Sequence, residues 1–306
     1  MKTLNFLKME GSGNDFIVFS NKNKEINLSP AWVKKICQKI IGKGSGNDFI
    51  VFSNKNKEIN LSPAWVKKIC QRRTGIGADG LIIIEDSKKA DFLMRIINSD
   101  GSEAEMCGNG ARCAALFATL SSVAKPKMVF ETKAGLIRAE VFNNEVKINL
   151  NNPNSLILNK MIKLEDSSLL VHHINTGVPH TVLILKEISS VDVESLGKKI
   201  RFHQDFAPKG TNVNFVKVIN KENIEVRTYE RGVESETLSC GTGSAASACI
   251  GYLLKLTYPP VKVKTAGGEY LTIDFQEKDS QITNLSMSGP VSVVYEGKIK
   301  NPNLEI

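Results

Sequence analysis

The sequence predicts a mixed α/β fold built from two similar halves. Three observations lead to this prediction: short apolar runs typical of strands, two helices rich in small residues, and the same order of elements in the second half as in the first. With 306 residues, of which 42% are hydrophobic and 24% charged, the chain can bury one large core or two cores of ordinary size.

The first half opens with the strand LNFLKMEG and then contains an internal duplication, because residues 11–38 recur unchanged at 44–71. Each copy encodes a strand (DFIVFS), a polar turn and a short helix opened by Ser-Pro, where proline suits the first helical position. Solenoid repeats drift in sequence and need three or more units, unlike this identical pair. We interpret the copy as a recent tandem duplication or an error of sequence assembly; the alternative is a pair of equivalent binding loops.

Only one strand and one helix of the two copies are expected to occupy the native positions. About 33 residues should then be extruded at a modest cost in loop-closure entropy, and we place the duplication at about 39–71. The first strand continues from LNFLKMEG and the second helix continues into RRTGIGADG, so we expect a hybrid in which these two are native.

The remaining elements alternate in a regular order. In the first half they are the strands LIIIEDS and DFLMRIINSDGS, the helix GARCAALFATLSS, and the strands KMVFETKAG, LIRAEVFN and EVKINL. In the second half they are the strands LLVHHINTG, HTVLILKEI, NVNFVKVI and IEVRTYERG, the helix GSAASACIGYLLKL, and the strands VKVKTAGG, EYLTIDF and PVSVVYEG. We expect domains at 1–150 and 151–288, with the tail 289–306 returning to the first domain.

The two halves also match in detail around two cysteines. SEAEMCGNGARCAAL leads to Thr132, 25 residues after Cys107, and SETLSCGTGSAASA leads to Thr265, 25 residues after Cys240. Two diverged halves are the simplest explanation. Such halves usually pack about a pseudo-twofold axis, so we expect the two C-G-x-G turns to face one cleft.

Composition narrows the class of protein. The net charge of +8 comes from scattered basic residues without interleaved aromatics, which argues against a nucleic-acid partner. The first apolar run is too short for a secretory signal, and no stretch is long enough for a membrane helix, so we expect a soluble, cytoplasmic protein. Its six cysteines should therefore be reduced, and without a CxxC pair a structural zinc site is not expected.

Each C-G-x-G turn is placed at the start of a helix. A helix N-terminus presents unpaired N–H groups and the positive end of the macrodipole, so it lowers a thiol pKa and binds carboxylate. Inverting a stereocentre without a cofactor needs one group to remove a proton from one face and a second group to deliver one to the other. A symmetric pair, Cys107 and Cys240, suits this two-base chemistry.

The cysteines and the glycine-rich segments have other possible interpretations. Buried cysteine is ordinarily a small hydrophobic residue, and we assign that role to Cys113, Cys249, Cys37 and Cys70. Facing thiols can also oxidise to an inactive disulfide when substrate is absent. GIGADG, residues 75–80, fits GxGxxG but leads from helix to strand, the reverse of a dinucleotide site, and GxGxxA at 241–246 is a weak rival.

At these residues the sequence closely resembles the diaminopimelate epimerase family. The resemblance covers nearly the whole chain apart from the duplicated segment, and it rests on KMEGSGNDF, GIGADG, NSDGSEAEMCGNGARC, GVPHTV, TNVNFV and YERGVESETLSCGTGSAA. Proline racemases and hydroxyproline epimerases share the two-cysteine logic, but their first turn typically reads CGHG. Phenazine-biosynthesis isomerases look similar in fold but lack the cysteine pair.

The resemblance implies two α/β domains, each a curved, mostly antiparallel sheet wrapped around a central helix. It implies conversion of LL-2,6-diaminopimelate to the meso form for lysine and peptidoglycan synthesis, without pyridoxal phosphate, metal or any other cofactor, by a homodimer. The implied catalytic residues are Cys107, Cys240, His180 and Glu230. The implied substrate-binding residues are Asn14, Asn98, Gly108, Asn109, Asn212, Glu230, Arg231, Gly241 and Thr242.

Two positions depart from the family pattern. Val178 stands where many relatives have asparagine, and the GNDF asparagine occurs twice, as Asn14 and Asn47. We expect Asn14 to reach the site because FLKMEG precedes it. For His180 a structural, hydrogen-bonded role is the plain alternative, and the asparagines have the alternative of ordinary turn residues. A racemase acting on another amino acid and a catalytically dead binding protein remain open as alternative functions.

Overall fold

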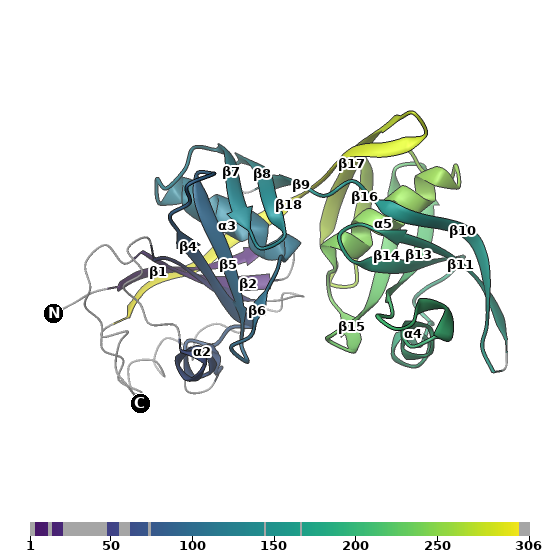
Figure 1. The fold of residues 1–306 in the computed structure, drawn as a ribbon, viewed down its shortest axis with the longest axis horizontal. Helices are drawn as coiled ribbons and strands as arrows, with labels where there is room; N and C mark the ends of the chain where they lie inside the picture. The colour runs from purple at the N-terminus through teal and green to yellow at the C-terminus, as the bar shows by residue number, and fades with distance from the viewer. Residues whose placement is uncertain are drawn as a thin grey trace. The chain divides into compact units, whose positions relative to one another are not determined.

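Figure 1 shows the computed structural model, which describes residues 4–11, 14–20, 48–54, 62–72, 75–143, 145–165 and 167–299. The chain divides into two compact units. Unit 1 comprises Met1–Ile148 and Gly289–Ile306, and unit 2 comprises Asn149–Ser288. The strand β18 (Gln281–Ile299) belongs to both, because its first part pairs with β17 and its last part pairs with β1.

The described part of unit 1 contains the helices α2 and α3. Its elements are β1 (Leu4–Gly11), β2 (Asn14–Ser20), β3 (Phe49–Ser53), α2 (Pro63–Cys70), β4 (Gly80–Glu85), β5 (Phe92–Asn98), β6 (Glu103–Ala104), α3 (Gly108–Leu120), β7 (Lys127–Thr132), β8 (Gly135–Phe142) and β9 (Glu145–Asn149). Helix α2 starts as predicted, with Ser62 as N-cap and Pro63 as its first residue.

Unit 2 follows the same plan, and it includes two elements that the sequence analysis missed, β10 and α4. Its elements are β10 (Asn154–Lys163), β11 (Ser168–Asn175), β12 (Pro179–Leu185), α4 (Val193–Arg201), a 3₁₀ turn at Gln204–Phe206, β13 (Asn212–Asn220), β14 (Asn223–Glu230), β15 (Ser235–Thr237), α5 (Gly241–Leu253), β16 (Val261–Thr265) and β17 (Tyr270–Lys278).

Five strand pairings of unit 1 have a counterpart of the same direction in unit 2. In unit 1, β3–β4 and β5–β7 are parallel, while β4–β5, β5–β6 and β7–β8 are antiparallel. In unit 2, β12–β13 and β14–β16 are parallel, while β13–β14, β14–β15 and β16–β17 are antiparallel. The repeat seen in the sequence is therefore a repeat of topology. The predicted fold class is confirmed.

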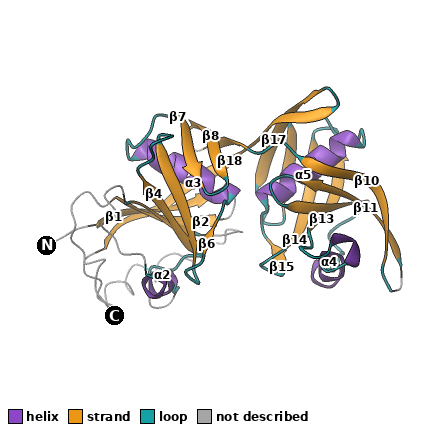
Figure 2. Ribbon diagram, in the orientation of Figure 1, coloured by secondary structure: helices purple, strands orange, loops and turns teal. Residues whose placement is uncertain are grey.

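Each unit wraps its strands around one helix, α3 in unit 1 and α5 in unit 2 (Figure 2). Helix α3 contacts β1, β3, β4, β5 and β8, and α5 contacts β11, β12, β13, β14, β16 and β17. Ten residues of α5 and ten of α3 are buried, so neither helix has a solvent face. Alanine, glycine and serine make this possible, because small side chains let strands approach the helix from several sides.

The duplicated segment departs from our prediction. Both copies of the strand enter the sheet: β2 and β3 pair in parallel, with Ile17 opposite Ile50 and each residue opposite its own copy. Both also pair with β1, where Leu7–Met9 face β3 and the residues on either side face β2. The prediction that a single strand would be accepted is wrong, because two identical sequences have the same affinity for the edge of β1.

The second copy makes buried contacts within unit 1. Its strand β3 is buried throughout and also pairs with β4. Asp48, fully buried ahead of this strand, accepts hydrogen bonds from the Arg72 guanidinium and from the backbone N–H of Asp79, at 2.5 Å to Nη1 and 2.9 Å respectively. This network ties the second copy to the GIGADG turn before β4. Residues 39–47, and with them Asn47, lie outside the described residues.

Candidate active site

In unit 2 the sequence CGTG opens α5 as predicted. Cys240 is the N-cap residue, with extended backbone at φ −119° and ψ 107°, and its side chain is buried. Its Sγ lies 3.6 Å from the hydroxyl of Thr242, a distance suited to a hydrogen bond with sulfur. The thiol therefore sits at the mouth of α5, where the first N–H groups of the helix create a positive local potential.

His180 is linked to this turn. The side chain, from β12, is fully buried, and its Nε2 lies 3.0 Å from the hydroxyl of Thr242. Burial, together with the nearby His173 and Arg231, lowers the pKa of His180 to about 3. The imidazole is therefore neutral near pH 7, and it reaches Cys240 through Thr242 rather than directly.

Three residues of unit 2 that the resemblance implies as substrate-binding, Asn212, Glu230 and Arg231, lie at or next to the ends of β13 and β14. Asn212 accepts a hydrogen bond from the backbone N–H of Arg231 at 2.8 Å and donates one to the carbonyl of Pro179 at 3.0 Å. Burial raises the pKa of Glu230, and the nearby Thr237 acts in the opposite direction. Asn212 thus holds the Glu230–Arg231 turn beside the strand that carries His180.

In unit 1 the sequence CGNG opens α3 in the same way. Cys107 is the N-cap residue, is partly exposed, and accepts a hydrogen bond from the backbone N–H of Gly110 at 3.5 Å. Asn109 is buried in the first turn and accepts a hydrogen bond from Arg112 at 3.0 Å. Arg112, whose side chain is fully buried, therefore stabilises the turn from inside the helix.

Asn98 lies at the end of β5, in the hairpin that leads to Cys107. Its side-chain amide donates a hydrogen bond to the hydroxyl of Ser102 at 3.0 Å. In the strand register Asn98 faces Gly80 across β4–β5, and the structure places Asn98 at an exposed position. The hydrogen bond to Ser102 is consistent with the alternative that Asn98 is an ordinary turn residue. The exposed position of Asn98 also leaves its side chain accessible to a ligand.

The second glycine of each cysteine turn, Gly110 or Gly243, packs against a side chain of the sheet beneath it. A Cβ on Gly110 would lie 3.2 Å from Cδ1 of Ile82, and a Cβ on Gly243 would lie 2.4 Å from Oδ1 of Asn214. Glycine at these positions also lets a ligand approach the backbone of the turn. A side chain at Gly243 would displace Asn214, and one at Gly110 would require Ile82 to shift slightly.

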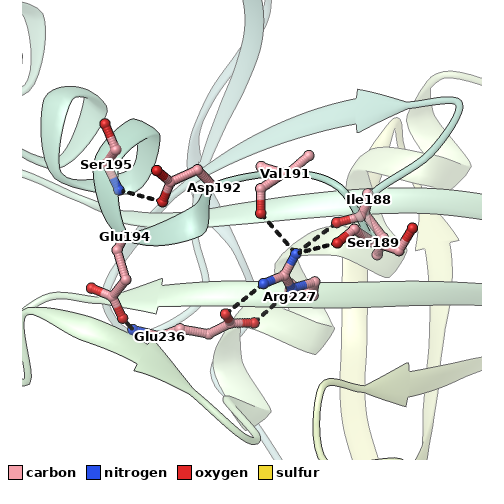
Figure 3. Close-up of polar contacts among 8 residues, drawn as sticks. All are labelled: Ile188, Ser189, Val191, Asp192, Glu194, Ser195, Arg227 and Glu236. Atoms are coloured by element: carbon pink, nitrogen blue, oxygen red, sulfur yellow. Dashed lines mark hydrogen bonds and ion pairs between the residues drawn. The ribbon is translucent and has the colours of Figure 1, made fainter.

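An arginine–glutamate pair precedes each cysteine turn. In unit 2, Arg227 binds Glu236 through Nε and Nη2, both at 2.7 Å. Figure 3 shows that the same guanidinium donates to the carbonyls of Ile188 and Val191, at 2.7 and 2.9 Å. Unit 1 has the same pair in Arg95 and Glu103, at 2.8 and 3.1 Å.

Glu103 and Glu236 each stand four residues before their cysteine, on β6 and β15. Each pair joins the long strand of a hairpin to the short strand that enters the cysteine turn. The two pairs therefore fix the path of the chain into Cys107 and Cys240. Sequence reasoning missed them, although the equal spacing in the two halves was a signal that could have revealed them.

The other described cysteines are core residues. Cys70, Cys113 and Cys249 are buried, as the small-hydrophobe interpretation predicts. Burial raises the pKa of Cys70 to about 12, with the nearby Asp48 and Asp79 adding to the effect, and burial also raises the pKa of Cys249. Cys37 lies outside the described residues.

Comparison with known proteins shows to which family the chain belongs. The family model for diaminopimelate epimerase matches residues 39–156 and 172–294. The chain belongs to the diaminopimelate epimerase family. The match begins at residue 39 and so includes the second copy of the duplicated segment.

Relatives in the diaminopimelate epimerase family match over almost their full length. The diaminopimelate epimerase of Aquifex aeolicus (strain VF5) is 46% identical, covering 99% of this chain and 100% of that protein. The diaminopimelate epimerase of Hydrogenobaculum sp. (strain Y04AAS1) is 43% identical, covering 95% of this chain and 97% of that protein. The similarity thus extends over nearly the whole of this chain and of both relatives.

Solved structures share the fold at low sequence identity. A hydroxyproline epimerase from Agrobacterium vitis superposes with a TM-score of 0.63 at 14% identity, covering 98% of this chain and 91% of that one. A probable proline racemase from Agrobacterium radiobacter K84 gives a TM-score of 0.61 at 16% identity, covering 96% and 92%. This fold therefore occurs among epimerases and racemases that act on other amino acids.

Two buried residues near the cysteine turns, Asn214 and Arg112, were not assigned to the site from the sequence. Asn214 lies in the motif TNVNFV, and its side chain contacts His180, yet only its neighbour Asn212 was assigned to the site. Arg112 in GARC was interpreted only as part of a helix.

In the part of the chain that the structure describes, no helix is long and apolar enough to span a membrane.

Proposed function

We propose that this protein is an epimerase that interconverts LL- and meso-2,6-diaminopimelate with Cys107 and Cys240 as the two acid–base groups. The observation that supports this most directly is the matching position of the two thiols. Each is the N-cap residue of a buried helix, α3 or α5, that follows the same arrangement of strands in its own unit. The meso product is a precursor of lysine and peptidoglycan.

The proposed chemistry uses one thiol from each unit. One cysteine, as thiolate, removes the α-proton from one face of the substrate, and the other, as thiol, delivers a proton to the opposite face. N–H groups of Gly108–Asn109 and Gly241–Thr242 bind the carboxylate at the reacting centre. They also stabilise the negative charge that develops on that carboxylate when the α-proton leaves.

The distal amino-acid centre needs both donors and acceptors, because it carries an ammonium and a carboxylate. We assign Arg231 to the carboxylate, which a guanidinium can grip with two parallel hydrogen bonds. Asn98, Asn212 and the backbone of Glu230–Arg231 complete this set. His180 and Glu230 assist the proton balance of the cysteines, and the homodimer expected from the family is part of the proposal.

The GNDF asparagine is assigned by a pair of variants, because two copies exist. Asn14 begins β2, where it pairs with Gly11, and Asn47 immediately precedes the buried Asp48. We keep Asn14 as the expected ligand. Loss of activity in Asn14→Ala with full activity in Asn47→Ala supports it, and the reverse result assigns the role to Asn47.

The deciding experiment is proton exchange in deuterium oxide. LL-diaminopimelate is incubated with the wild-type protein, and the appearance of deuterium at the α-carbon is followed together with the formation of the meso isomer. Cys107→Ala and Cys240→Ala should each abolish epimerisation while circular dichroism shows an intact fold. Cys113→Ala is the matched control, because this thiol lies inside α3, and it should keep activity.

Two results would contradict the proposal. Full epimerisation by either variant rules out the two-thiol mechanism. Exchange with proline or hydroxyproline, but none with diaminopimelate, moves the protein to a different substrate class within the same fold.

A further inference from the structure

Asn214, on β13, is a fully buried residue whose side-chain orientation is fixed by its neighbours. Its Nδ2 donates a hydrogen bond to the backbone carbonyl of Thr181 at 3.2 Å, and its Oδ1 accepts one from the hydroxyl of Thr228 at 3.0 Å. A carbonyl can only accept, so the amide nitrogen must be the atom on that side. The second hydrogen of Nδ2 points to Nδ1 of His180, 3.1 Å away.

This contact determines where the proton of His180 sits. Because Nδ1 accepts a hydrogen bond from Asn214, it carries no proton, and a neutral imidazole must then carry its proton on Nε2. The low pKa of His180, caused by burial and by the facing His173 and Arg231, keeps the ring neutral. His180 is thus a donor toward Thr242, whose Oγ1 lies 3.0 Å from Nε2.

The direction of the hydrogen bonds then continues to the thiol. The Thr242 hydroxyl accepts from His180, so its own hydrogen is available for Sγ of Cys240 at 3.6 Å. Thr176 donates to the backbone carbonyl of Thr242 at 2.9 Å and holds the turn in place. A donor aimed at sulfur stabilises the thiolate, which accepts hydrogen bonds more strongly than the thiol does.

The same positions in unit 1 are apolar. Strand register pairs Phe49 with Gly80 as it pairs His180 with Asn212, which makes Phe49 the counterpart of His180. By the same registers, Ile82 is the counterpart of Asn214, and Ile96 the counterpart of Thr228. Ile82 lies under Gly110 as Asn214 lies under Gly243. Phe49, Ile82 and Ile96 therefore cannot form with their side chains the hydrogen bonds that His180, Asn214 and Thr228 form behind Cys240.

We propose that Asn214 is a positioning residue that fixes the proton of His180 on Nε2, so that Thr242 donates to Cys240 and holds this thiol as the thiolate in the resting protein. The inference rests on the proposed role of Cys240 as an acid–base group. It concerns Cys240: the protein prepares this thiol as a base before substrate binds.

The first test measures the reactivity of each thiol in the substrate-free protein. Iodoacetamide alkylates thiolate and releases iodide, so its rate at a fixed pH reports the thiolate fraction. Mass spectrometry of the peptides gives separate rates for Cys240 and Cys107. Thr242→Val removes the hydroxyl but keeps the shape, and it should lower the rate at Cys240 about tenfold, which corresponds to about one pH unit in the titration of the thiol.

Two internal controls accompany this measurement. Thr242→Ser restores the hydroxyl and should return the Cys240 rate to within about twofold of wild type, a rescue that a merely structural role of Thr242 does not predict. The rate at Cys107 should be unchanged in both variants. Equal Cys240 rates in Thr242→Val and wild type would overturn the proposal.

The second test observes the imidazole of His180 directly, in the wild-type protein. In protein labelled with ¹⁵N-histidine, the His180 signals, assigned by their loss in His180→Gln, should show a bare Nδ1 and a protonated Nε2. Asn214→Asp replaces the donor with an acceptor of the same shape and should move a proton onto Nδ1. A protonated Nδ1 in the wild-type protein would overturn the assignment.

The outcomes of these tests are separate from those of the proposed function. Wild-type protein that shows the expected alkylation and tautomer but does not epimerise diaminopimelate would overturn the substrate assignment alone. Protein that epimerises diaminopimelate while Thr242→Val alkylates at the wild-type rate would overturn the hydrogen-bond chain alone.

Discussion

Removing the guanidinium of Arg227 should destabilise unit 2 by about 3 kcal/mol. Figure 3 shows this side chain between Glu236 and the backbone before α4. Two hydrogen bonds to backbone carbonyls, at 2.7 and 2.9 Å, should contribute about 1 kcal/mol each after exchange with water. The pair with Glu236 adds about 1 kcal/mol, a low value because the Arg227 side chain is 23% exposed and partly screened by solvent.

The variant for this test is Arg227→Met, which keeps the aliphatic stem and removes all five N–H donors. Urea unfolding followed by circular dichroism gives the free energy of unfolding, and the slope of the transition shows whether the two states have changed in compactness. Glu236→Gln is the matched variant, because it weakens only the pair and should cost about 1 kcal/mol. Arg227→Lys should lie between the two, since a lysine presents one point of attachment in place of a planar fork.

A particular result would refute this reasoning. If Arg227→Met and Glu236→Gln destabilise the protein equally, the carbonyl bonds contribute nothing and the ion pair alone accounts for the effect. The consequence for activity is separate: because Glu236 stands on the strand that leads to Cys240, Arg227→Met should lower kcat more than it changes KM.

The remaining predictions concern the helices, the histidine and the duplication. Gly197→Ala should destabilise the protein by about 1–3 kcal/mol in thermal and urea melts, because its Cβ would lie 2.5 Å from Cβ of Tyr229; no loss would mean that α4 can shift. His180 has a lowered pKa, so the unfolded state binds more protons between pH about 6.5 and about 3, and stability should fall as pH falls through this window. His180→Gln should make that part of the stability–pH curve shallower, and an unchanged curve would show that another group is responsible. Deleting 39–71 should preserve or raise activity and the unfolding midpoint, and deleting 11–43 yields the same polypeptide because the copies are identical; an unfolded product would contradict the interpretation of the extra segment as an insertion.

The sequence by itself determined the elements and their order. Glycine after each cysteine, alanine-rich runs and Ser-Pro at Ser62–Pro63 are local signals, and the helices α2, α3 and α5 begin where those signals stand. The repeat of motifs in the two halves likewise predicted a repeat of topology. Helix α4 was missed because its apolar positions are few and its sequence is dominated by charged residues.

The tertiary structure decided which side chains meet. Asn214 and His180 are 34 positions apart, and neither has a local pattern that indicates the contact, since it arises from parallel pairing of β12 with β13. The same holds for Asp48 and Arg72, which are 24 positions apart and form an ion pair that neither local pattern indicates. Local propensity is a property of neighbouring residues, whereas hydrogen-bond direction, burial and the choice between identical segments depend on partners that only the folded chain brings together.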